Sequence, residues 1–153
     1  FLISLALCKC DGFNWYHNID INDCSKNDIE VLAQFINNSK NNLNFDMDVD
    51  LNNVIDPLEL GWQLWEEGRL IHWICNDVPS PFYIYNYNCE LSGNIPENID
   101  QLTSIMKLNL QYNNLEGIIP NSICNLNVSK TSDYWFKINH NHYHSNFLIS
   151  RLP

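Results

Sequence analysis

Leu91-Ser92-Gly93-Asn94-Ile95-Pro96 and Leu115-Glu116-Gly117-Ile118-Ile119-Pro120 are near-copies of one another, and the second follows the first after 24 residues. Apolar residues extend both copies at matching offsets: Ile99 and Leu102, then Ile123 and Leu126. Self-similarity at a fixed period indicates a repeat architecture, in which each unit buries its apolar face against its neighbours. The repeat therefore predicts an α/β solenoid, which offers a surface for binding rather than a pocket for chemistry.

One full repeat runs from Leu102 to Ile123, and it closely resembles the plant-type extracellular leucine-rich repeat. The resemblance implies a short strand over residues 107–110 on a concave side. It also implies that the amide of Asn113 bonds backbone groups inside the bend and that Pro120 starts a turn on the convex side. The fold expected from the family is a short leucine-rich repeat array.

The segment before the repeats is also similar to this family. A cysteine loop, a helix and the stretch Glu59 to Gln63 resemble the N-terminal cap of secreted repeat proteins of marine bacteria, which carry an EF-hand-like loop there. The expected organisation is a signal-peptide remnant (1–7), a helical, disulfide-containing N-terminal cap (8–67), the repeats (68–143) and an irregular tail of a truncated chain (144–153). A short buried strand or helix is the alternative for residues 1–7.

Two helices are expected in the cap, and a first strand is expected after it. Ser25 can cap a first helix, whose apolar residues Ile29, Leu32, Ala33, Phe35 and Ile36 have helical spacing. Pro57 suits the first turn of a second helix, which carries Leu58, Trp62 and Trp65 and is ended by Gly68. Residues 70–75 then predict the first strand.

Six cysteines occur, without the short paired spacings of a zinc site. Cys10 with Cys24 and Cys75 with Cys89 bracket loops of equal length, and we predict these two disulfides. Sequence alone does not fix connectivity, since six cysteines allow 15 pairings. Disulfides and an export signal together favour a secreted or cell-surface location, including the periplasm.

The net charge of −10 argues against nucleic acid and anionic membranes as partners. Beyond the first residues, no apolar run approaches the ~18 residues of a membrane span. We therefore expect no transmembrane segment.

An acidic stretch matches the ligand register of an EF-hand-type loop. Oxygen ligands fall at loop positions 1, 3, 5, 7, 9 and 12, where position 7 uses a backbone carbonyl: Asp48, Asp50, Asn52, Val54, Asp56 and Glu59. Asn53 takes the place of the usual glycine and tolerates the left-handed conformation. The sequence thus predicts a structural Ca²⁺ site, with a solvated acidic turn as the alternative.

The side chains that alternate with the inward leucines point out of the sheet. They form the predicted recognition surface: Lys107, Asn109, Gln111, Tyr112, Lys137, Asn139 and His140. We expect that the protein is not an enzyme. It should instead be a non-catalytic module that binds a protein or glycan through this concave face. A calcium-stiffened structural or adhesive surface protein is the alternative function, and a merely solvated face is the alternative for these residues.

Overall fold

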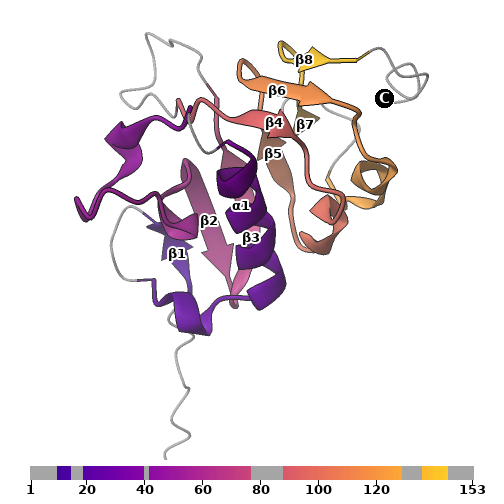
Figure 1. Ribbon diagram of the computed structural model, residues 1–153. Coiled ribbons are helices and arrows are strands. Elements are labelled where there is room, and N and C mark those ends of the chain that lie inside the picture. Colours follow the sequence, from indigo (N-terminus) through magenta and orange to yellow (C-terminus); the bar gives the residue numbers. More distant parts are fainter. Residues whose placement is uncertain (1–9, 15–18, 40–41, 77–87, 129–135, 145–153) are drawn as a thin grey trace, which may run out of the picture.

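The computed structural model describes residues 10–14, 19–39, 42–76, 88–128 and 136–144 (Figure 1). These ranges contain one α-helix, five 3-10 helices and eight short strands. In chain order they are β1 (Gly12–Phe13), η2 (Ile21–Asp23), α1 (Lys26–Asn38), η3 (Phe45–Met47), η4 (Pro57–Glu59), β2 (Trp62–Glu66), β3 (Arg69–Ile74), β4 (Ser92–Asn94), η5 (Ile99–Gln101), β5 (Lys107–Asn109), β6 (Asn114–Gly117), η6 (Asn121–Asn125), β7 (Phe136–Lys137) and β8 (His142–Tyr143).

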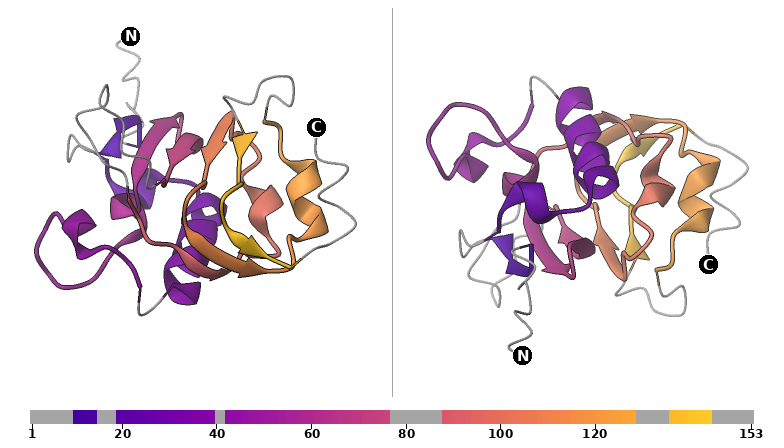
Figure 2. Two further views of the ribbon diagram at one scale, coloured as in Figure 1. Left: turned by 90° about the horizontal axis from the view of Figure 1, so that it is seen from above. Right: turned by 90° about the horizontal axis from the view of Figure 1, so that it is seen from below.

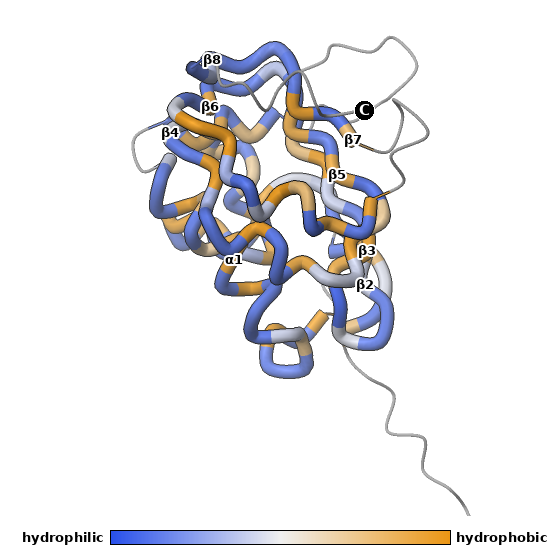
Figure 3. Tube along the Cα trace, turned by 90° about the vertical axis from the view of Figure 1, so that its right-hand side faces the viewer, coloured by the Kyte–Doolittle hydropathy of each residue, from blue (hydrophilic) through white to orange (hydrophobic). Residues whose placement is uncertain are grey.

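The strands form two sheets. The larger has the order β1-β2-β3-β5-β7, antiparallel from β1 to β3 and parallel from β3 to β7. The smaller has the order β4-β6-β8 and is parallel throughout. Figure 3 shows β2, β3, β5 and β7 stacked along one side of the molecule and β4, β6 and β8 along the other. The protein is therefore a small mixed α/β domain.

The predicted solenoid of leucine-rich repeats is wrong, because the described chain forms one helix and two sheets, one mixed and one parallel. A solenoid needs one register that recurs from coil to coil. Here the separation of paired residues along the chain differs in all four parallel pairs: His72 with Lys107, Leu108 with Phe136, Ser92 with Asn114, and Glu116 with His142. The two near-copies do pair as β4 and β6, but Gly93 lies opposite Leu115 and not opposite Gly117.

The first predicted helix is confirmed as α1. The Ser25 side chain accepts a hydrogen bond from the backbone N–H of Asp28, which caps the first turn. The buried residues Val31, Leu32 and Phe35 lie on one face of the helix. At its C-terminal end the Ser39 hydroxyl donates to the carbonyl of Ser92 and accepts from the Ser92 N–H, so the end of α1 is fixed to β4.

The second predicted helix is wrong beyond its first turn. Only Pro57–Glu59 is helical, as η4, and Trp62–Glu66 forms β2. Along β2 the fully buried Gln63 and Trp65 alternate with the half-buried Trp62 and Leu64, which is the period of two expected of a strand. The three-to-four spacing of Leu58, Trp62 and Trp65 imitates a helical face only because two different elements contribute to it.

Gly68 ends no helix. It belongs to the tight turn from β2 to β3, where Glu67 and Gly68 both have positive φ, 49° and 77°. Two residues with positive φ suit a two-residue hairpin connection, because that turn matches the twist of the paired strands. The predicted strand over 70–75 is confirmed as β3.

The core lies between α1 and the sheets. Its largest fully buried side chains include Trp65, Trp73 and Phe35, and the Phe35 and Trp73 rings meet edge to face with centroids 4.9 Å apart. Figure 3 shows apolar residues in the stacked strands β3, β5 and β7. Both predicted disulfides are present, Cys10–Cys24 and Cys75–Cys89. None of the described helices has the length and apolar character needed to cross a membrane.

Candidate metal centre and polar face

The acidic loop runs between η3 and η4 and projects from the body of the protein (Figure 2). Ligand oxygens of Asp48, Asp50 and Glu59, one from each side chain, all lie within 4.8 Å of one another. Three carboxylates at this separation could hold a metal ion. Three of the six predicted metal ligands are therefore brought together by the structure.

Asp48 organises the first half of the loop from a buried position. One of its carboxylate oxygens accepts from the backbone N–H of Asn52 at 3.1 Å, and the other accepts from the N–H of Asn53 at 2.8 Å. Asn53 has a φ of 66°, the left-handed conformation predicted for the place where glycine is usual. Ile55 is buried, so its side chain anchors the loop to the core.

Glu59 closes the loop from η4. Its Oε1 accepts from the backbone N–H groups of Val49 and Asp50, at 2.8 and 3.3 Å, and its Oε2 accepts from the N–H of Asp56 at 2.9 Å. Asp56 and Glu59 form a reciprocal capping box on η4. The Glu59 side chain, predicted as the ligand at the twelfth loop position, thus already faces the start of the loop.

Of the other predicted ligands in the same loop, the Asp56 carboxylate lies outside this group of three. Asp56 caps η4, and the amide oxygen of Asn52 accepts from the N–H of Val54 at 2.7 Å. In an EF-hand-type loop the ninth position often binds through water, which is consistent with a more distant Asp56.

Leu60 and Gln63 connect the exit of the loop to the core, and no sequence motif indicates these contacts. The carbonyl of Leu60 accepts from Trp73 Nε1 and from Gln63 Nε2, both at 2.9 Å. Gln63 is fully buried, donates also to the carbonyl of Pro57, and accepts from Trp65 Nε1. Glu59 therefore directly precedes the residue whose carbonyl accepts from the buried Trp73, and Gln63 links that carbonyl to the buried Trp65.

The seven predicted recognition residues differ in exposure. Asn109 and Gln111 are each only 9 % exposed, and the Asn109 side chain accepts from the backbone N–H of Gln111. The pairing of β5 with β7 places Asn109 beside Lys137. The pairing of β3 with β5 places Lys107 beside His72. Tyr112, Asn139 and His140 are exposed.

Tyr112 and His140 form a stacked pair at the ends of neighbouring strands. Their ring centroids are 4.1 Å apart and the rings are 8° from parallel. Both residues have a φ of 57°, and the Tyr112 N–H donates to the carbonyl of Asn139. Left-handed backbone at two residues that are not glycine is uncommon, and such positions concentrate at functional sites.

Another ring contact on the larger sheet joins the two hairpin strands. Trp62 of β2 stacks on His72 of β3 with centroids 6.2 Å apart, and Phe13 lies 5.1 Å from Trp62. Burial lowers the pKa of His72 below its ordinary 6.5, the charge of Lys107 lowers it further, and Glu66 opposes both. Trp65 and Trp73 are fully buried, so they pack the core.

Comparison of the chain with protein-family models, with curated proteins and with solved structures finds no match. Function must therefore be argued from the geometry of the site.

Proposed function

We propose that this protein is an extracellular calcium-binding domain that acts without catalysis. The observation that carries the proposal is the convergence of Asp48, Asp50 and Glu59 oxygens within 4.8 Å. The left-handed Asn53 supports it, because a loop of the EF-hand type needs that conformation at its sixth position. The two disulfides support an oxidising compartment outside the cytosol.

Calcium suits this loop better than a transition metal does. The side chains that converge offer only oxygen, and hard cations such as Ca²⁺ prefer carboxylate and carbonyl oxygen, whereas zinc and copper sites use imidazole and thiolate. Ca²⁺ also accepts irregular geometry at six to eight oxygens, while Mg²⁺ demands a near-ideal octahedron. An extracellular module of this kind would bind Ca²⁺ with a Kd of roughly 0.1–1 mM.

The role proposed for the ion is structural. Glu59 lies next to Leu60, whose carbonyl receives the hydrogen bonds of Trp73 and Gln63. An ion held by Glu59 would fix this junction and stabilise the folded state by mass action, because it binds the folded chain and not the unfolded one.

A calcium titration of thermal stability tests the proposal. At a hundredfold excess over Kd the ion should raise the melting temperature by about 5–10 °C. Glu59→Gln should abolish most of this shift, whereas Glu97→Gln, at an exposed position outside the loop, should leave it intact. The measured quantity is the calcium-dependent shift, since Glu59 also caps η4 and its loss lowers the starting stability. If the melting temperature of the wild type does not change with calcium in the 10⁻² M range, the loop is an acidic turn and not a calcium site.

The second candidate function is recognition of a protein or glycan through the polar face around Tyr112 and His140. It is favoured by their stacked, exposed rings, which present a flat surface of the kind that aromatic side chains offer at binding sites. Lys137 and Lys107 add positive charge to this face in a chain of net charge −10.

A glycan array and a peptide library probe this second function. Tyr112→Ala and Lys137→Ala should remove binding, and Glu116→Gln on the smaller sheet should not. Calcium-dependent stability together with binding that survives both changes would favour a structural or adhesive surface protein.

A further inference from the structure

The projecting acidic loop and the 3-10 helix before it carry several exposed large apolar side chains. Among the described residues, nine large hydrophobic side chains are exposed, and four of them lie in the ten residues 45–54. Their exposed fractions are 58 % for Phe45, 54 % for Val49, 81 % for Leu51 and 55 % for Val54. We call these four side chains the apolar rim. Exposed apolar residues scattered singly need no explanation, but four within ten consecutive residues depart from that pattern.

The apolar rim is distinct from the carboxylates of the same loop. Asp48 and Glu59 turn inward, where they accept backbone N–H groups across the loop. Leu51 lies between two of the acidic residues and is the most exposed of the large apolar side chains. Metal binding uses the oxygens inside the loop, so it gives no reason for leucine or valine on the outside.

Leu51 also has an unfavourable backbone. Its φ is 60°, a left-handed conformation that is rare for a bulky residue and that asparagine or glycine would adopt at lower cost. Neither burial nor local backbone preference therefore explains a leucine at this position. A contact made by its side chain outside the chain would explain it.

The charge of the loop selects the kind of partner. Residues 45–59 contain five carboxylates, Asp46, Asp48, Asp50, Asp56 and Glu59, and no lysine, arginine or histidine. A bound divalent ion would leave this segment still negative. Complementary charge steers partners and suppresses wrong ones, so an apolar patch within a negative field suits a partner that combines apolar and basic side chains.

We propose that the apolar rim docks a basic, amphipathic segment of a partner protein. Leu51 and Val49 would meet the apolar face of that segment, and its lysines and arginines would lie over the surrounding carboxylates. An anionic lipid surface is disfavoured, because it carries the same sign of charge as the loop. This inference goes beyond the proposed calcium site and does not require that site to be occupied.

The probe is a synthetic peptide of leucine and lysine that forms an amphipathic helix, with a fluorescent label, titrated with the full chain at fixed calcium. The control peptide has the same composition in scrambled order, so its apolar residues share no face. We expect saturable binding of the amphipathic peptide only. Binding should weaken as NaCl is raised towards about 0.5 M, because salt screens exposed charges.

Leu51→Asn is the decisive variant. Asparagine is tolerated at positive φ, so the melting temperature should not fall. Losing a leucine that becomes buried in the complex should weaken affinity about tenfold or more. Ile118→Asn is the matched control, since Ile118 is 60 % exposed but lies outside the loop, and it should leave affinity unchanged.

Each of three results with the peptides would overturn the proposal. These are equal binding of the scrambled peptide, unchanged affinity in Leu51→Asn, and no saturable binding of the amphipathic peptide. Retention of the protein on phosphatidylserine vesicles that depends on Leu51 would assign the rim to a membrane and would also overturn it. The calcium-dependent shift in melting temperature, measured on the same samples, tests the metal site separately.

Discussion

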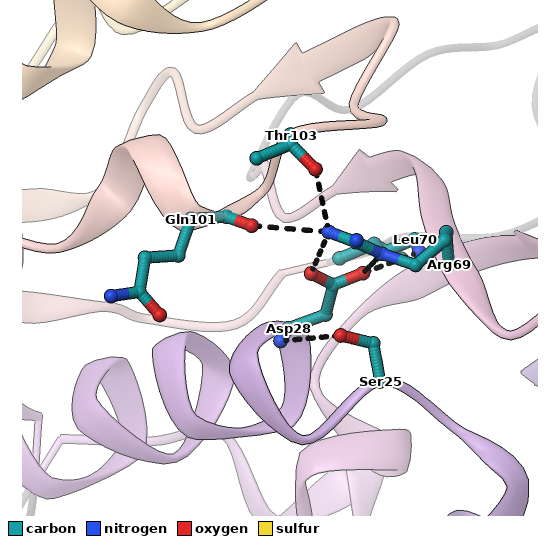
Figure 4. A network of polar contacts seen from close by, with 6 residues as sticks. All are labelled: Ser25, Asp28, Arg69, Leu70, Gln101 and Thr103. Carbon is teal, nitrogen blue, oxygen red and sulfur yellow. Dashed lines mark hydrogen bonds and ion pairs between the residues drawn. The ribbon is translucent and has the colours of Figure 1, made fainter.

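Arg69 holds the buried carboxylate of Asp28 in a two-pronged ion pair (Figure 4). Arg69 Nε donates to Asp28 Oδ2 at 2.9 Å and Nη2 donates to Oδ1 at 2.7 Å. The backbone N–H of Leu70 donates to the same carboxylate. Arg69 Nη2 also donates to the Gln101 carbonyl and to the Thr103 hydroxyl. The first turn of α1, the start of β3 and the end of η5 therefore meet at this ion pair.

Asp28→Ala should lower the free energy of unfolding by about 3–5 kcal/mol, because removing one partner of a buried pair leaves the other partly buried and uncompensated. Urea denaturation measures the change, and Glu30→Ala, an exposed change on the same helix, is the control. Arg69→Lys should cost less than Asp28→Ala but remain destabilising, since lysine lacks the planar fork that bonds both oxygens. If Asp28→Ala matches the Glu30 control, the ion pair is not the link that joins these elements.

Gly61→Ala should be strongly destabilising. Gly61 has a φ of 69°, and an added Cβ would lie 2.6 Å from the Ile74 carbonyl oxygen and 2.9 Å from Cys89 Sγ. Both the backbone conformation and the close approach to the Cys75–Cys89 disulfide exclude a side chain there. Gly12→Ala separates the two causes, because Gly12 also has a positive φ but has no atom within 4 Å of an added Cβ. Thermal melts should show the larger loss at Gly61, and equal losses would mean that strain alone decides.

The parts of the structure that the sequence predicted are those fixed by neighbouring residues. Ser25, Leu32 and Phe35 specify α1 within a few turns, and the acidic loop carries its own ligand register, so Asp48, Asp50 and Glu59 could be named in advance. The equal sequence separation within the pairs Cys10–Cys24 and Cys75–Cys89 likewise predicted both disulfides.

The parts that failed depend on how the elements pair with one another, which the spacing of residues along the chain does not show. The pairing of β2 with β3 decides that Trp62–Glu66 is a strand, and local spacing cannot show that pairing. The two near-copies are 24 residues apart, so a repeat predicts that Gly93 lies beside Gly117. In the structure β4 pairs with β6 in a different register, with Gly93 opposite Leu115. Asp28 and Arg69 are 41 positions apart, so no local motif indicates their contact.

Removal of the Cys10–Cys24 disulfide should lower the free energy of unfolding by about 3 kcal/mol, since the bond closes a loop of roughly 15 residues and restricts the unfolded chain. The variant carries Cys10→Ser and Cys24→Ser, and urea denaturation gives the difference. Cys124→Ser, an exposed change outside both disulfides, should have little effect. Non-reducing peptide mapping checks the pairing itself, and a Cys24–Cys75 linkage would contradict it.

Stability should fall as the pH drops from about 7 towards 5, and His72 should account for part of the loss. Burial and the charge of Lys107 hold the pKa of His72 below its ordinary 6.5 in the folded protein, against the opposing effect of Glu66. The unfolded chain therefore takes up the proton first, so the contribution is complete above pH 6.5 and is lost as the pH falls through the lowered pKa. His72→Gln should flatten this part of the profile of unfolding free energy against pH. Lys107→Gln should raise the pKa of His72, which NMR titration of the imidazole measures, and an unchanged pKa in that variant would show that Lys107 does not act on it.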